Sequence, residues 1–168
     1  GCSLTNEIVI KKYSQYLKSG IIKLIKLPPR EDGSIFVGST RQAGIEAADG
    51  DILTNLDADD YIGANHLKNI SERFDTDNFQ WVYFNCYRKL DILKGVEELV
   101  QVEPEIGSLF TTCISWRRDL NVSWNHCNGR QDNIVFNSLL LEKYHLKTKI
   151  YGCSYTIANA VIESVSNN

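Results

Sequence analysis

The spacing of apolar positions predicts helices that alternate with short strands in the first half of the chain. Apolar residues recur at near-helical spacing over residues 4–18, and a glycine shortly afterwards ends the expected helix. The apolar run at 21–27 predicts a buried strand that ends at a pair of prolines. Beyond a loop rich in charge and glycine, Ser39 or Thr40 is expected to cap a helix that runs to about Ala48.

The remaining pattern predicts further strands and a second amphipathic helix. Residues 52–56 form a short apolar strand, and the polar stretch at 64–74 predicts a helix. Aromatic and β-branched residues predict strands at 79–87 and 109–116, and a last strand is expected at 148–151. We also expect a shorter strand within 90–102, a helix over 133–144 and a frayed tail after 162. The pattern predicts an α/β layered domain with a mainly parallel central sheet flanked by helices.

Length and composition narrow the class of protein. A chain of 168 residues suits one core, so we expect a single domain over 1–168. The apolar fraction of 43% and the charged fraction of 23% are ordinary for a soluble globular protein. A formal net charge of -3 argues against a nucleic-acid-binding protein, which usually has a basic surface. No apolar run approaches the roughly 18 residues of a transmembrane segment, and no signal-peptide pattern is found.

The cysteines bear on the compartment. Five cysteines without CxxC spacing signal neither a zinc site nor a dense disulfide framework. Reduced thiols in a cytoplasmic protein are therefore the simplest interpretation. Peripheral contact with a membrane stays open as an alternative, although no amphipathic basic helix supports it.

An acidic cluster carries the sharpest chemical signal. Asp57, Asp59 and Asp60 follow the apolar run at 52–56 directly. Like charges this close repel each other unless something positive is bound. Ligands of open α/β sheets bind outside the carboxyl ends of the strands, and Mg²⁺ is typically held by one or two carboxylates plus phosphate oxygens. The cluster by itself leaves two interpretations open, a metal–phosphate site and a solvated acidic turn that caps the next helix.

A dehalogenase-like phosphotransferase is a further alternative for this cluster. Proteins of that family also present Asp-x-Asp after an apolar strand. The resemblance requires threonine or valine where Tyr61 stands, and a later lysine and aspartate-rich motif that cannot be placed in this sequence.

The residues around the cluster resemble family 2 glycosyltransferases. Residues 41–52 read Arg-Gln-Ala-Gly-Ile-Glu-Ala-Ala-Asp-Gly-Asp-Ile, and residues 56–60 read Leu-Asp-Ala-Asp-Asp. The family pattern is an Arg-Asn-x-Gly helix, a small-Gly-Asp turn, an apolar strand and Asp-x-Asp-Asp, and Gln42 stands here in place of the asparagine. The resemblance implies a GT-A-like, Rossmann-like fold and an inverting, hexosyltransferase-like enzyme. It also implies a nucleotide-diphospho-sugar donor, most simply a UDP-sugar, and a divalent metal, Mn²⁺ or Mg²⁺.

The same resemblance assigns the donor side of the site. It implies that Asp59 binds the metal that bridges the donor diphosphate, and that Asp57 holds the ribose or shares the metal shell. Arg41 is implied to lie near the diphosphate, where a guanidinium suits phosphate oxygens. The alternative for Arg41 is a solvated helix charge, and Gly44 is expected to allow close packing of the helix on the sheet.

A second carboxylate is required because inverting transfer needs a base for the acceptor hydroxyl. Residues 129–136 resemble the later Glu-Asp motif of the family, which implies that Asp132 is the catalytic base, although Gln131 replaces the glutamate. The arginine pair at 117–118 resembles the stretch ahead of that motif. The alternative for Asp132 is a helix N-cap, for which aspartate is among the best residues.

Further candidates are assigned to the acceptor side. Asp60, Trp116 and Gln131 are the residues that we expect there. Trp116 and Trp124 could stack on sugar faces, but buried tryptophans more often belong to a core. His126 could bind substrate or metal, although a lone loop histidine usually does neither.

The resemblance covers about residues 3–152, and the first strand or strands of the family have no counterpart in this sequence. The expected acceptor is a saccharide or a lipid-linked saccharide, and bacterial surface polysaccharide biosynthesis is an expectation by analogy. The substituted Gln131 and the unmatched start leave a second hypothesis open, a non-catalytic GT-A-like domain that binds a sugar nucleotide or a protein partner.

Overall fold

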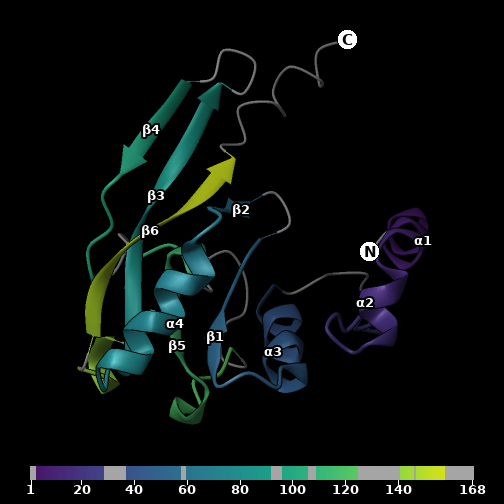
Figure 1. Cartoon of the computed structure of the whole chain (residues 1–168), viewed down its shortest axis with the longest axis horizontal. Helices are drawn as coiled ribbons and strands as arrows, with labels where there is room; N and C mark the ends of the chain where they lie inside the picture. The colour runs from purple at the N-terminus through teal and green to yellow at the C-terminus, as the bar shows by residue number, and fades with distance from the viewer. Residues whose placement is uncertain are drawn as a thin grey trace.

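The protein is an α/β layered structure built on one twisted sheet (Figure 1). The computed structural model describes residues 3–28, 37–57, 60–91, 96–105, 109–124, 141–145 and 147–157. The strand order is β1-β5-β3-β6-β2, and β4 pairs with β3 off this path. The strands are β1 (Ile52–Thr54), β2 (Tyr61–Ile62), β3 (Trp81–Asp91), β4 (Val96–Val100), β5 (Ile114–Arg117) and β6 (Lys147–Ile157).

The helices differ in how closely they approach the sheet. They are α1 (Ser3–Lys12), α2 (Ser14–Lys18), α3 (Val37–Ala47) and α4 (His66–Thr76), with short 3-10 helices η1 (Thr111–Cys113) and η2 (Arg118–Leu120). Helix α4 lies across the sheet and α3 lies beside β1, whereas α1 and α2 lie beyond α3, away from the sheet (Figure 1).

The structure confirms the predicted helices and corrects one boundary. The helices expected over 4–18 and 64–74 are present, the first of them divided at Tyr13 into α1 and α2. Helix α3 ends at Ala47, close to the predicted end, but it begins at Val37. The predicted capping role of Ser39 or Thr40 is therefore wrong, because both residues lie inside the helix. Local propensity identifies good capping residues but does not say which of them begins the helix.

Four of the six predicted strands are present, a fifth is only partly a strand, and the sixth, at 21–27, is not a strand. The strands expected at 79–87, within 90–102 and at 148–151 correspond to β3, β4 and β6, and β1 is shorter than the predicted 52–56. At 109–116 the structure has η1 followed by β5 instead of one strand. Of the helix expected over 133–144, residues 141–144 belong to the described part of the chain, and 141–143 of them are helical. The tail after 162 lies outside the described residues.

The prediction of a mainly parallel sheet is wrong for the strands that the structure describes. Four of their five pairings are antiparallel, and only β3 with β6 is parallel. The prediction rested on helices that alternate with strands in the first half of the chain. Strands β3, β4 and β5 instead follow one another without an α-helix between them in the described part of the chain, and such short connections favour antiparallel pairing.

The segment 21–28 does not form the predicted buried strand. It pairs with no strand of the described part, and Ile21 is 74% exposed while Leu24, Ile25 and Leu27 are also exposed. Lys23 Nζ attaches the segment to the end of α3 by donating a hydrogen bond to the Ala47 carbonyl at 2.7 Å. The prediction of a buried strand is therefore wrong, because burial needs a covering layer that the apolar run itself cannot supply.

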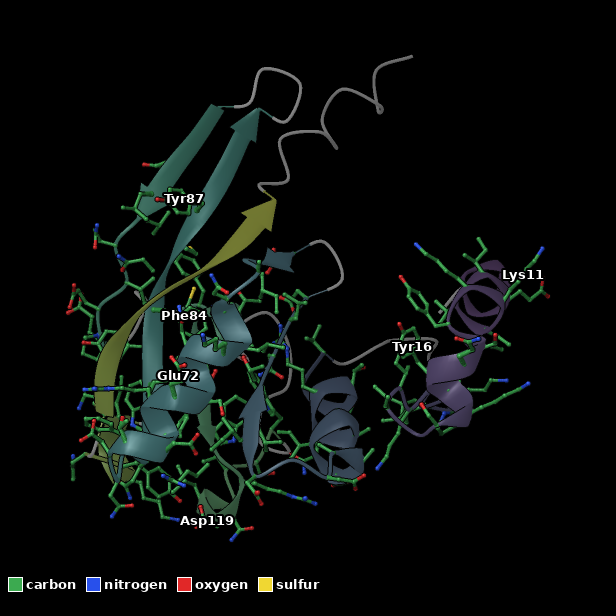
Figure 2. All side chains as sticks on the ribbon, in the orientation of Figure 1. Lys11, Tyr16, Glu72, Phe84, Tyr87 and Asp119 are labelled. Atoms are coloured by element: carbon green, nitrogen blue, oxygen red, sulfur yellow. The ribbon has the colours of Figure 1, made fainter. Side chains whose placement is uncertain are left out.

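The core lies between α4 and the sheet. His66, Ile70 and Phe74 recur at four-residue spacing and form the buried face of α4, because residues four apart lie on one side of a helix. His66 meets Phe84 on β3, which lies beside α4, whereas Lys11 and Tyr16 extend from helices away from the sheet (Figure 2). The core also contains Leu53, Trp81, Val82, Cys86, Val102, Leu109, Cys113, Ile114, Trp116, Val122, Trp124 and Tyr144. Cys86 and Cys113 are buried, and neither belongs to a disulfide in the described part of the chain.

His66 is a buried histidine whose surroundings make it sensitive to pH. Its side chain is 2% exposed, its ring meets the Phe84 ring edge-on at 4.3 Å, and neither ring nitrogen has a hydrogen-bond partner in the described part of the chain. Burial lowers the pKa of the imidazole from its usual 6.5 because the charged form loses its hydration. The neutral imidazole is therefore the form that folds.

We expect the free energy of unfolding to fall as the pH drops below about 6.5, where the unfolded chain binds a proton that folded His66 does not. Above that pH both states are neutral and this group has no effect. Each pH unit of difference between the two pKa values corresponds to about 1.4 kcal/mol. We would measure the free energy of unfolding by urea denaturation at several pH values in this range. This free energy should change less steeply with pH in His66→Leu than in the unaltered chain. His145→Gln, at an exposed position, should keep the dependence of the unaltered chain. An unchanged slope in His66→Leu would assign the dependence to another group.

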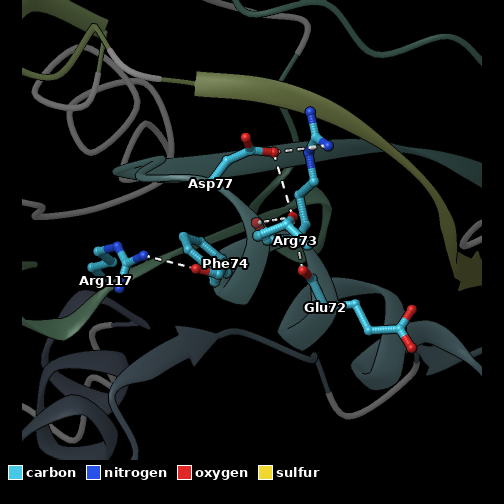
Figure 3. A network of polar contacts seen from close by, with 6 residues as sticks. Glu72, Arg73, Phe74, Asp77 and Arg117 are labelled. Carbon is cyan, nitrogen blue, oxygen red and sulfur yellow. Dashed lines mark hydrogen bonds and ion pairs between the residues drawn. The ribbon is translucent and has the colours of Figure 1, made fainter.

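Arg117 joins β5 to the end of α4. Its Nε donates to the Phe79 carbonyl at 2.7 Å, and an Nη donates to the Phe74 carbonyl at 3.0 Å (Figure 3). The last carbonyls of a helix have no partner within the helix, so this guanidinium satisfies one of them. It also lies 5.2 Å from the centre of the Phe74 ring. Arg117, which resembled part of a family motif, therefore has a structural role.

We expect Arg117→Lys to lower the free energy of unfolding by about 2 kcal/mol, because an ammonium cannot reproduce the two-point contact of a guanidinium. The neighbouring Arg118 is exposed, so Arg118→Lys is the matched control and should change stability by less than about 0.5 kcal/mol. Urea denaturation measures both. Equal effects for the two variants would show that the bonds of Arg117 to α4 add little.

Candidate functional site

A cavity of about 480 Å³ lies where α3 meets the end of β1. One face of α3 and the residues from Leu53 to Asp57 line it, and Trp116 of β5 contributes from the sheet. The walls are largely apolar, with the side chains of Thr40, Arg41, Thr54, Asn55 and Asp57 as polar groups. This size and this mixture of surfaces are typical of a site for a small molecule.

Arg41 and Asp57 form an ion pair in the lining of this cavity. One Nη of Arg41 is 2.8 Å from Asp57 Oδ1 and 3.1 Å from Oδ2. The Arg41 side chain is 12% exposed and that of Asp57 is 45% exposed. A nearly buried guanidinium requires a negative partner, and Asp57 supplies it while keeping oxygen surface open to solvent. The structure thus brings together two of the residues that the sequence assigned to one site.

Trp124 also contacts the Arg41 guanidinium. The carbon at the centre of the guanidinium is 4.8 Å from the centre of the Trp124 ring. A cation over an aromatic face is stabilised by the ring's quadrupole, most strongly where water is excluded. Trp124 is 1% exposed, so its ring packs in the core and does not present an open face for a sugar. Trp116 is also 1% exposed, and its part in an acceptor site stays a prediction.

Gln42, next to Arg41 on α3, binds the segment that contains Trp124. Its Oε1 accepts a hydrogen bond from the Trp124 backbone N–H at 2.9 Å and one from Ser123 Oγ at 3.2 Å. Its Nε2 donates to Glu46 Oε1 at 3.0 Å, one turn later on the helix. Sequence analysis did not predict these contacts. The available signal was that Gln42 departs from the asparagine of the family pattern.

Asn55 is a second residue that sequence analysis missed. Its side-chain nitrogen is buried and has no hydrogen-bond partner among the described residues, although the residue lines the cavity. An unsatisfied buried donor costs about 1–3 kcal/mol, which a ligand acceptor could recover. The signal in the sequence was an amide inside the otherwise apolar run at 52–56.

The acidic cluster is described in part. The Asp60 backbone N–H donates to the Asp57 carbonyl at 3.0 Å. Asp59, His126, Gln131 and Asp132 lie outside the described residues, and their roles stay predictions. Within the described ranges, no three His, Cys, Asp or Glu side chains gather as a metal site.

Gly44 does not have the predicted packing role. A Cβ added there would meet no atom of the described residues within 4 Å. Gly44 instead lines the cavity beside Arg41 and a second cavity of about 420 Å³ between α3 and the segment 21–25. The expectation that glycine is needed for close helix–sheet packing is therefore wrong in the described part of the molecule.

Comparison with known proteins identifies the family. No curated protein matches this chain. None of the helices in the described ranges is long and apolar enough to cross a membrane. The family model for glycosyl transferase family 2 matches residues 6–132, well over half of the 168 residues. The matched region contains Arg41, Gln42, Asp57 and the whole acidic cluster. Family membership implies a GT-A type of fold, and the chain belongs to the family 2 glycosyltransferases, whose general activity is glycosyl transfer.

Proposed function

We propose that this chain, as a single GT-A-like domain, transfers a sugar from a nucleotide-diphospho-sugar, most simply a UDP-sugar, to an acceptor hydroxyl with inversion. The observation that carries the proposal is the Arg41–Asp57 pair in the wall of a 480 Å³ cavity at the end of β1. A cavity of that size can hold a nucleoside. A bound diphosphate could replace part of the contact that the Arg41 guanidinium makes with the Asp57 carboxylate.

The two residues of the pair are assigned to different parts of the donor. Arg41 supplies a positive group for the diphosphate, and its position is limited by Asp57 on one side and the Trp124 ring on the other. Asp57 has surface left to accept a hydrogen bond from a ribose hydroxyl. Asn55 adds a donor that is without a partner in the described part of the molecule.

The residues present fit a hard divalent cation. Asp57 and Asp59 offer carboxylate oxygens, the ligand type that Mg²⁺ and Mn²⁺ prefer. Because Arg41 already balances the charge of Asp57, we assign Asp59 as the principal metal ligand and Asp57 as the secondary one. When bound, the metal supplies Lewis-acid stabilisation of the leaving nucleoside diphosphate.

Asp132 is assigned as the base of the reaction. Its carboxylate takes the proton of the acceptor hydroxyl as that oxygen attacks the anomeric carbon from the side opposite the leaving diphosphate. Asp60, Trp116 and Gln131 are assigned to the acceptor side. A saccharide or lipid-linked saccharide is the proposed acceptor.

Two other functions remain as competing candidates. The glutamine at position 131, where the family has glutamate, favours a non-catalytic domain that binds a sugar nucleotide or a protein partner. A phosphotransferase would need Asp57 as a free nucleophile. The ion pair with Arg41 disfavours that use, since it holds both carboxylate oxygens within 3.1 Å of a guanidinium nitrogen.

The direct test is calorimetric titration of UDP into the intact chain, in Mn²⁺ and then in EDTA. We expect binding that requires the metal and that is lost in Asp59→Ala. Asp75→Ala, which removes an exposed carboxylate on α4, is the matched control and should bind as the unaltered chain does. Binding that persists in EDTA would contradict the metal assignment. A phosphorylated aspartate at 57 after incubation with a phosphate donor would favour the phosphotransferase.

A further inference from the structure

The contacts of Gln42 connect two segments of the chain that are far apart in the sequence. Gln42 lies on α3, and its hydrogen-bond partners Ser123 and Trp124 follow it by 81 and 82 residues. Trp124 in turn lies against the guanidinium of Arg41, the neighbour of Gln42 on the same helix. The two adjacent residues of α3 therefore hold the same tryptophan, one by its backbone and the other by its ring.

The chemistry of these contacts fixes the orientation of the Gln42 amide. A backbone N–H can only donate, so the atom that faces the Trp124 nitrogen at 2.9 Å must be the accepting oxygen, Oε1. The amide nitrogen then faces outward and meets the Glu46 carboxylate, which can only accept. All three bonds agree with one orientation. The bond to Glu46 lies at the surface, and the two bonds to the 123–124 segment are partly buried.

We propose that Gln42 is a positioning residue, which sets the place of Arg41 in the donor site by holding the Trp124 ring beneath its guanidinium. Without Gln42, the segment 123–124 loses two of its hydrogen bonds to α3. The Trp124 ring is then held less firmly against the guanidinium, and the position of Arg41 is less narrowly limited. This inference rests on the proposed function for its effect on donor binding, but the arrangement itself is independent of any ligand.

Side-chain length explains why glutamine serves this role. Asparagine is shorter by one methylene group, so from the same helix position its oxygen would fall short of the Trp124 backbone nitrogen, which is 2.9 Å from Oε1. Glutamine, which stands at position 42 in place of the asparagine of the family pattern, is thus long enough to reach the 123–124 segment in this chain. The same segment leads toward Asp132 in the sequence, which joins the donor side to the stretch that carries the assigned base.

The test is a double-mutant cycle on UDP affinity in Mn²⁺, measured by calorimetry on the full chain. Gln42→Ala should weaken UDP binding about tenfold in the unaltered background, the scale of one or two lost hydrogen bonds. In an Arg41→Ala background the same change should have less than about a twofold effect, because the residue through which Gln42 acts is gone. Glu46→Ala removes only the surface bond and should leave the affinity within about twofold of the unaltered chain.

Additive effects of Gln42→Ala and Arg41→Ala would overturn the proposal, since they would show a role that does not pass through Arg41. So would an equal loss in Glu46→Ala. Urea denaturation of each variant confirms that the comparison is between folded proteins. A merely structural contribution of Gln42 would lower stability in both backgrounds without this dependence on Arg41.

A ligand-free readout separates this proposal from the proposed function. In ¹⁵N-labelled protein, Gln42→Ala should move the Arg41 Nε–Hε and Trp124 indole resonances, and Glu46→Ala should leave both in place. Arg41→Lys and Trp124→Phe assign the two signals by their disappearance. If the unaltered chain fails to bind UDP but these resonances move, the donor assignment fails and the positioning contact stands. If the resonances do not move, the positioning role is refuted whatever the binding result.

Discussion

Asp132→Asn is expected to lower kcat about a thousandfold while leaving UDP affinity unchanged. A general base contributes about 10²- to 10⁴-fold to the rate of a proton-transfer step, and asparagine cannot accept the proton. Asparagine is as good a helix N-cap as aspartate, so this substitution removes the base without removing a cap. The measurement is the rate of UDP release from the UDP-sugar that binds best, together with calorimetric Kd values for UDP.

The same variant distinguishes three interpretations of Asp132. A large fall in kcat with unchanged Kd supports catalysis. Unchanged kcat and unchanged stability would leave Asp132 as a helix cap and require another base. A fall in stability with both constants altered would indicate a structural carboxylate. Gln131→Glu, which restores the family residue, is the companion variant, and we expect it to retain UDP binding because it lies on the acceptor side of the proposal.

Arg41→Ala is expected to weaken UDP binding about a hundredfold, corresponding to about 2.7 kcal/mol. The substitution removes a guanidinium that is 12% exposed and held between Asp57 and Trp124. Charge-assisted contacts made by such a sheltered group are stronger than those of a surface cation. Arg41→Lys should recover part of the loss, because lysine restores the charge without the planar, two-point geometry.

Salt and a matched control test the electrostatic origin of this effect. Lys68 is a surface cation of α4 with 69% of its side chain exposed, and Lys68→Ala should leave UDP affinity unchanged within about twofold. Added salt should weaken binding to the unaltered chain more than to Arg41→Ala, because the variant has lost the contact that ions screen. Equal affinity of Arg41→Ala and the unaltered chain would mean that Arg41 serves only to balance Asp57.

The local pattern of residues was sufficient where a segment's neighbours along the chain decide its conformation. Helix α4 could be predicted because His66, Ile70 and Phe74 recur at the spacing of one helical face, whatever layer covers them. Strand β3 could be predicted because its aromatic and β-branched residues suit an extended, buried backbone. That Arg41 and Asp57 lie at the same site could also be predicted, because the motif implied that both bind the donor.

The predictions that were wrong depend on contacts between segments that are far apart in the sequence. The run at 21–27 has the composition of a buried strand, but no strand of the described part pairs with it, and its apolar side chains are exposed. The order of the elements could not show whether neighbouring strands are parallel or antiparallel, because this depends on which strands approach each other after the chain turns. Gly44 was expected to relieve a close contact that the described structure does not contain.

The amino-acid sequence by itself determined the family, the order of most elements and the residues of the donor motif, because these depend on residue types at short separations. The tertiary structure alone decided that the sheet is mostly antiparallel, that Trp124 lies beneath Arg41, and that Gln42 reaches a backbone amide 82 residues away. Contacts between residues so far apart in the sequence depend on how whole segments pack against each other. The periodicity of residues along the chain does not show how the segments pack.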